Sequence, residues 1–113
     1  MQEIAKKSPK AFLDVRESLF EAHKAVWDDD GFVFYGDADG ELYAIAIPDI
    51  FIYSYLMLEY FPAHGIGIEY NKLNKYSVID YNKPISDQSR FNGKIKTPQQ
   101  AIEKALEIRE GQI

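Results

Sequence analysis

The chain has no cysteine, and its 113 residues include only two histidines and one tryptophan. Without thiols it can form neither a disulfide nor a thiolate metal site, and this composition fits a reducing compartment such as the cytoplasm. Basic residues are fewer than acidic ones: the chain has thirteen Lys and Arg and eighteen Asp and Glu, which gives a formal net charge of −5. Nucleic-acid-binding proteins usually need a basic face to neutralise phosphates, so we expect no nucleic-acid partner.

Long uninterrupted apolar runs are missing as well. Residues 1–7 lack the apolar stretch of a signal peptide. The most apolar tract, residues 42–61, contains Pro48, Asp49 and Glu59. A charge at the centre of a bilayer costs about 2.5–3.5 kcal/mol, so we expect no membrane span and predict a cytoplasmic protein.

Recognisable catalytic patterns are scarce. None of Ser54, Ser77, Ser86 and Ser89 lies in a Gly-x-Ser-x-Gly elbow, and the glycines of residues 65–67 lack the third glycine of a phosphate loop. A histidine that acts as a general base needs a carboxylate to orient its ring, and Glu59 or Glu69 is a candidate partner for His64. The other histidine, His23, falls on the core face of the first helix, and we expect it to be half-buried. We expect no catalytic residue and no cofactor, and an enzyme is the less favoured class.

Acidic residues gather in two places. Asp37, Asp39 and Glu41 alternate around a turn, but the spacing lacks the further ligands of an EF-hand loop and favours a solvated turn. The three consecutive aspartates, Asp28, Asp29 and Asp30, point in different directions in any extended backbone and are unsuited to one metal ion. We therefore expect no metal site and interpret residues 28–30 as an acidic loop available to basic side chains of a partner.

The last helix is the clearest element in the sequence. Thr97 and Pro98 fit the N-cap and the first turn, Gln100 fits a capping box, and Gly111 fits the left-handed residue that closes a helix. Between them lies an apolar stripe that must be buried. We expect an ordered domain that extends almost to the last residue. The stripe consists of Ala101, Ile102, Ala105, Leu106 and Ile108.

The other elements follow from spacing and turn chemistry. Ser8 and Pro9 open a predicted helix over residues 8–27, which the acidic loop 28–31 ends. Two strands, 32–35 and 41–47, flank a turn at 36–40 and form a hairpin. Residues 50–61 fit a buried helix better than a strand, and Pro62 stops it. We then expect strands at 65–70 and 76–81 joined by a turn at 71–75, and a polar loop over 82–96 anchored by Phe91 and Ile95.

This order, α-ββ-α-ββ-α, predicts a single α+β domain over residues 1–113. Hairpins pair antiparallel, so we expect a two-layer sandwich in which one four-stranded antiparallel sheet carries the helices on one face.

Tyrosine is abundant, with eight residues, and it is the residue type here that most favours a binding function. On a sheet covered on one face, alternate residues point away from the helices, so Tyr43, Tyr70, Tyr76 and Tyr81 are candidates for an exposed stripe. Tyrosine is enriched at protein interfaces. It also forms strands well and packs at core edges, so both interpretations remain open.

Several of these segments also resemble a group of known sequences. They are the turn at residues 37–40, the apolar helix over residues 50–61, the strand segment over residues 64–70 and the helix segment over residues 97–106. Together, over residues 30–108, they resemble small uncharacterised proteins of phages and prophages, chiefly in gut Bacteroidetes. The resemblance implies no activity and no functional residue.

The favoured hypothesis is a small, acidic, non-enzymatic protein-interaction module, such as a phage accessory, inhibitor or immunity protein. It would bind a protein partner or self-associate through the tyrosines and an acidic rim at Asp28, Asp29 and Asp30. The alternative is a small-molecule or nucleotide-binding protein, conceivably a hydrolase, with a tyrosine-lined pocket between helices and sheet that is reached past residues 82–96.

Overall fold

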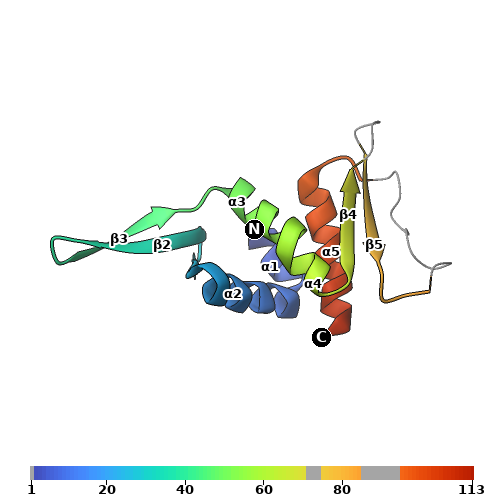
Figure 1. The fold of residues 1–113 in the computed structure, drawn as a ribbon, viewed down its shortest axis with the longest axis horizontal. Helices are drawn as coiled ribbons and strands as arrows, with labels where there is room; N and C mark the ends of the chain where they lie inside the picture. The colour runs from blue at the N-terminus through green and yellow to red at the C-terminus, as the bar shows by residue number, and fades with distance from the viewer. Residues whose placement is uncertain (1, 71–74, 85–94) are drawn as a thin grey trace.

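A computed structural model describes residues 2–70, 75–84 and 95–113 (Figure 1). The chain is α+β with antiparallel strands and with helices interleaved among them, as predicted. Its elements are α1 (Gln2–Lys7), α2 (Pro9–His23), β1 (Val26–Asp28), β2 (Gly31–Ala38), β3 (Glu41–Ala46), α3 (Asp49–Tyr55), the π-helical turn η1 (Leu56–Tyr60), α4 (Phe61–Ala63), β4 (Ile66–Tyr70), β5 (Tyr76–Asp80) and α5 (Pro98–Gln112).

The strands form two separate sheets, so the predicted single four-stranded sheet is wrong. One sheet has the order β1-β2-β3, and the other consists of β4 and β5. Figure 1 shows them on opposite sides of the helices, with β2 and β3 extending away from the body and β4 and β5 beside α5. The helix over residues 49–63 lies between the two hairpins in the chain and packs on α5, so it separates the sheets rather than covering one of them.

The first long helix is shorter than predicted. It ends at His23, and Lys24 adopts a left-handed conformation with φ 58°. Val26, Trp27 and Asp28 therefore belong to β1, and residues 29–30 form the turn to β2. The Trp27 ring packs edge-on against Phe12, with centroids 4.9 Å apart, and against Phe32 on the paired strand, at 5.0 Å. This cross-strand aromatic packing stabilises the extended conformation over the helical one.

The N-terminus of α2 is capped from a distance. The helix begins at Pro9 as predicted, but the Ser8 side chain makes no capping hydrogen bond. The Glu110 carboxylate of α5 instead accepts hydrogen bonds from the backbone N–H of Ala11, at 2.6 Å, and of Lys10, at 3.2 Å. A carboxylate at this position satisfies free N–H groups and complements the helix dipole.

Residues 50–61 are helical, as predicted, but Pro62 does not stop the helix, which begins at Asp49 and ends at Ala63. The N–H of Phe61 bonds to the carbonyl of Leu56, five residues back, which is the π-helical pattern. A proline ring clashes with the carbonyl four residues before it and has no N–H to donate. The wider turn immediately before Pro62 accommodates this ring without breaking the helix.

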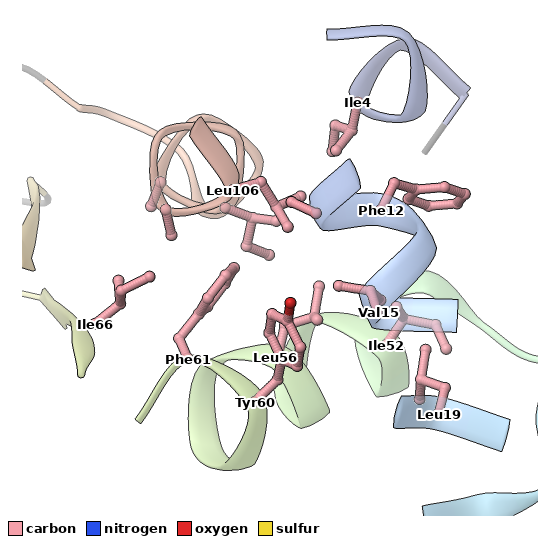
Figure 2. Packing of buried hydrophobic residues seen from close by; sticks show 14 of the residues in the cluster. Ile4, Phe12, Val15, Leu19, Ile52, Leu56, Tyr60, Phe61, Ile66 and Leu106 are labelled. Carbon is pink, nitrogen blue, oxygen red and sulfur yellow. The ribbon is translucent and has the colours of Figure 1, made fainter. Parts of the chain in front are cut away.

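The core is built mainly by helices. Figure 2 shows Leu56, Phe61 and Leu106 pointing inward from the central helix and α5, with Val15 of α2 and Ile66 of β4 beside them. All five are almost completely buried. The N-terminus of α5 follows its prediction, since Thr97 Oγ1 accepts from the Gln100 N–H at 3.2 Å, but the helix runs through Gly111 to Gln112.

Two further expectations concern the ends of β5 and the apolar tract. Ile95 is buried, and its carbonyl accepts a hydrogen bond from the Tyr76 N–H at 2.8 Å, so it anchors the segment as predicted. Phe91 and most of the predicted turn 71–75 lie outside the described residues. Within the described part of the chain, no helix is long and apolar enough to cross a membrane.

Candidate functional site

The β2–β3 hairpin, here called the arm (residues 31–46), is closed by a two-residue turn. Asp39 and Gly40 both have positive φ, 53° and 81°, and they join the paired residues Ala38 and Glu41. Two consecutive left-handed residues are typical of a type I′ turn, whose twist matches that of the strands. The predicted hairpin is confirmed, with a shorter turn than expected because Gly36 lies within β2 and pairs with Tyr43.

The arm projects from the helical body and exposes apolar side chains. The molecule measures 57 × 30 × 22 Å, and Figure 1 shows the arm along its longest dimension. Every residue of β3 is exposed. Scattered exposed apolar residues are ordinary, but a group of them on one projecting element indicates an interaction surface. The large exposed side chains of the arm are Phe34, Tyr35, Leu42, Tyr43 and Ile45.

The strand register divides these side chains between two faces. Phe34 pairs with Ile45, and Gly36 pairs with Tyr43, so the three large side chains share one face. The Tyr43 ring lies across Gly36, where an added Cβ would be 2.5 Å from Tyr43 Cζ. The glycine leaves room for the ring, and the ring covers a strand position that has no side chain of its own.

A cavity of about 290 Å³ opens at the base of the arm, between β2 and the helices α2 and α3. Phe34 of the arm lines it, so the cavity continues the face that also carries Tyr43 and Ile45. Tyr55 is its one tyrosine, and no described residue of the 82–96 segment lines it, unlike the tyrosine-rich pocket that the sequence suggested. The lining residues are Leu19, His23, Ala25, Phe34, Ile47, Phe51, Ile52 and Tyr55.

The four predicted tyrosines do not form one stripe, because they lie on different sheets. Tyr43 belongs to the arm, whereas Tyr70 and Tyr76 face each other across β4 and β5 with ring centroids 5.0 Å apart. Tyr81 follows β5, its ring lies across Gly67, and its hydroxyl donates to Glu69 Oε1 at 3.4 Å. The expected stripe required a single sheet, so only Tyr43 joins the apolar face of the arm.

The predicted acidic residues lie at both ends of β2. Asp28 at the end of β1 and Asp29 and Asp30 in the turn that enters β2 are all exposed, and the backbone N–H of Asp30 contacts the carbonyl of Asp28. A second acidic group lies at the arm's tip: Asp37, Asp39 and Glu41 are all exposed there. The apolar middle of the arm therefore lies between two acidic ends.

A polar cluster that the sequence did not predict joins three helical segments. Asp14 Oδ2 accepts hydrogen bonds from the Tyr60 hydroxyl at 2.7 Å and from Arg109 Nη2 at 3.1 Å, and Arg109 Nε donates to the Tyr60 oxygen at 3.3 Å. His64 Nε2 lies 3.7 Å from the same Asp14 oxygen. His64 is therefore placed beside Asp14 and not beside Glu59 or Glu69, the two carboxylates that the sequence offered as its partners.

The second histidine also differs from expectation. His23 is exposed rather than half-buried, and its Nε2 lies 3.5 Å from Glu59 Oε2. Its ring packs edge-on against Tyr55, whose hydroxyl contacts the Ser18 hydroxyl. No sequence signal pairs these residues, because the helix that carries Glu59 packs on α2 only in the folded chain.

The polar cluster has defined charges at neutral pH. Burial alone would raise the pKa of Asp14, but the hydrogen bonds from Tyr60 and Arg109 and the nearby positive charge lower the pKa below its usual value. Burial lowers the pKa of His64, and the charge of Arg109 lowers it further against the opposing effect of Asp14. Burial and the bond to Asp14 raise the pKa of Tyr60. The cluster thus holds an ionised carboxylate, a protonated phenol and a neutral imidazole, which suits it to joining α5 to α2 and η1.

Comparisons with protein families, curated proteins and solved structures return no match to this chain. The arm, the cavity at its base and the polar cluster are therefore the basis for a functional assignment.

Proposed function

We propose that the chain is a small, acidic, non-enzymatic protein-interaction module whose docking surface is the arm together with the cavity at its base. The observation that carries this proposal is the placement of Phe34, Tyr43 and Ile45 on one exposed face of an element that projects from the core. The core is built elsewhere, so these side chains contribute little to folding. A projecting two-stranded element is marginally stable by itself, and an apolar surface on it gains stability when a partner covers it.

The charges around the arm favour the same proposal. An apolar centre with a polar rim is the usual anatomy of a protein interface. Here the rim is acidic, from Asp28, Asp29 and Asp30 at one end and from Asp39 and Glu41 at the other. Such a rim accelerates association with a partner that carries basic side chains around its own apolar patch. A phage accessory, inhibitor or immunity protein would use a surface of this kind.

A matched pair of variants tests the docking surface. Ile45→Ser removes an apolar side chain from the arm, and Leu58→Ser removes an exposed leucine from η1, distant from the arm in the chain. Wild type and both variants are used as bait for purified candidate partners and for host extract, after circular dichroism shows that all three are folded. We expect binding by wild type and L58S and loss of binding by I45S. Equal binding by all three proteins would contradict the proposal.

The cavity supports a second candidate, the binding of a small apolar molecule. Its volume is at the lower end of typical ligand sites, which begin near roughly 300 Å³. The lining has no Lys or Arg, so an aromatic or aliphatic compound fits better than a nucleotide, whose phosphates need cations. A compound at 100 times its Kd stabilises the fold by about 2.7 kcal/mol, which thermal-shift screening detects. Stabilisation by such compounds that Phe51→Ala abolishes would favour this candidate.

A further inference from the structure

We propose that β3 pairs antiparallel with β3 of a second copy of this chain, about a two-fold axis at Ala44, so that the two β1-β2-β3 sheets become continuous. This inference rests on the proposed function, because it uses the arm, and it names the partner as the chain itself. The acidic rim, which suits a basic partner, opposes this pairing, so the strand edge and the apolar side chains must provide the attraction.

The outer edge of β3 is suited to such pairing. The sheet has the order β1-β2-β3, and within residues 2–70, 75–84 and 95–113 no strand pairs with the far side of β3. Proteins usually protect a free edge with a lysine, a proline, a bulge or a very short strand. The six residues of β3 pair with β2 without a bulge, and they contain no lysine and no proline. An unprotected edge of this kind is a template for another strand.

The backbone defines one preferred register. The N–H of Ile47 donates to the carbonyl of Phe32 at 2.8 Å, so Ile47 bonds toward β2. In an antiparallel ladder the bonding direction alternates along the strand, so the N–H and C=O groups of Leu42, Ala44 and Ala46 point to the free edge. A two-fold axis at Ala44 pairs Leu42 with the partner's Ala46 and Ala44 with the partner's Ala44. Among the possible two-fold registers, this one pairs the outward N–H and C=O groups of all three of these residues on both strands.

The side chains agree with that register. Tyr43 lies opposite the partner's Ile45, and an aromatic residue beside a β-branched one is a favourable cross-strand pair. Glu41 lies opposite the partner's Ile47, so the two Glu41 carboxylates are at opposite ends of the paired strands. The segment from residue 42 to residue 47 has no charge, so the paired strands place no like charges opposite each other.

The apolar side chains near the β3 edge, counted over both faces of the arm, expose an area similar to that of a standard interface. Seven large side chains on the arm and at the start of α3 are between 39% and 77% exposed. At about 200 Å² for each side chain they expose on the order of 800 Å², and a standard interface buries about 800 Å² per partner. In the proposed register the tip of each arm reaches the partner's residues 48–51, which include two of the seven. The seven exposed side chains are Phe34, Tyr35, Leu42, Tyr43, Ile45, Ile50 and Phe51.

Light scattering after size exclusion tests the pairing with two matched lysine variants. Leu42 and Leu58 are both 77% exposed, so L42K and L58K make the same chemical change at equally exposed positions, one on the β3 edge and one on η1. We expect wild type and L58K to be dimers and L42K to dissociate at least about 30-fold more readily, because it places a charge on each strand edge opposite the partner's Ala46. Dimers of equal strength in all three proteins would overturn the proposal.

A single introduced cysteine tests the axis directly, since the chain has none of its own. In A44C the two thiols lie across the proposed axis, and a short bismaleimide should join two copies in high yield, while L58C should stay largely monomeric on a denaturing gel. Equal cross-linking of the two variants would overturn the register.

The outcomes for the two proposals are distinguishable. A wild type that remains monomeric at high micromolar concentration overturns the self-pairing. If I45S then still loses binding to another protein that wild type retains, the proposed function stands without it. If no protein, this chain included, binds in an arm-dependent way, both proposals fail.

Discussion

Asp14 and Arg109 are 95 residues apart in the chain, and their side chains form a 3.1 Å ion pair between α2 and α5. The pair is partly buried, and the hydroxyl of Tyr60 bonds to both partners. An ion pair that is supported by a further hydrogen bond and shielded from water contributes more to stability than an exposed pair. The cluster therefore holds the two ends of the chain and the central helix in one arrangement.

Tyr60→Phe tests the contribution of this cluster to stability. The substitution keeps the buried ring but removes the hydroxyl that donates to Asp14 and accepts from Arg109. We expect the free energy of unfolding to fall by about 1–2 kcal/mol, as measured by urea denaturation. Tyr35→Phe, at an exposed position on the arm, is the matched control and should change stability by less than about 0.5 kcal/mol. Equal losses in both variants would show that the cluster hydrogen bonds contribute nothing specific.

His64 makes the stability depend on pH. Its pKa in the folded chain is lowered, mainly by burial and then by Arg109, so the unfolded chain binds the proton more readily. Its effect is absent above the unfolded pKa of about 6.5, and stability falls as the pH decreases below that value toward the lowered folded pKa. The lowered pKa of Asp14 adds a second loss, which begins near the ordinary Asp value and continues as the pH falls through the folded pKa.

Denaturation at a series of pH values measures the His64 contribution. We expect wild type to lose stability between about pH 7 and pH 5 and H64Q to lose less over this interval. A wild-type curve that is flat over the interval, or an H64Q curve that matches it, would contradict the placement of a neutral His64 beside Arg109.

A pair of phenylalanines distinguishes the core from the docking surface. Phe61 is completely buried at the centre of the core (Figure 2), whereas Phe51 is 65% exposed. Phe61→Ala should lower the free energy of unfolding by about 3–5 kcal/mol. Phe51→Ala should lower it by less than about 1 kcal/mol and should instead weaken self-association. Thermal melts and light scattering on the same samples measure both quantities, and the reverse order of stability loss would contradict the assignment of the core.

Salt should strengthen the proposed dimer. Each copy has a net charge of −5, and the paired strands themselves are uncharged. In the proposed register the acidic tip of each arm also approaches the partner's Asp49. Screening of this repulsion, over a Debye length of about 10 Å at 0.1 M salt, lowers the dissociation constant. Sedimentation equilibrium at increasing sodium chloride should show tighter association, and weaker association would indicate an attractive ionic contact in its place.

The sequence predicted helices and turns well where their formation depends on interactions between residues a few positions apart. The Thr97 cap forms as predicted, because its oxygen needs only the N–H three residues later. The hairpin turn at Asp39 and Gly40 forms because these residue types tolerate positive φ. Residues 50–61 are helical, as their apolar spacing predicted, although Pro62 does not stop the helix. Trp27 was misplaced in a helix, because its aromatic partner Phe32 stabilises a strand that no helical spacing reveals.

The candidate site was predicted only in part. Tyr43 lies on the exposed face that we assign to docking, but Tyr70, Tyr76 and Tyr81 lie on the other sheet. A period of two along a strand shows which residues share a face and does not show which strands share a sheet. The arm's apolar content was visible in residues 42–47, but only the structure shows that the helices leave it uncovered.

By itself the sequence determined the three main helical segments, the two hairpins, the antiparallel pairing and the negative charge, because each depends on short-range spacing, turn residues or composition. Only the tertiary structure decided that the hairpins form separate sheets, that Glu110 caps α2, and that Asp14 meets Tyr60 and Arg109. These contacts join residues 46 to 99 positions apart, and their partners are selected by how the helices pack rather than by any pattern along the chain.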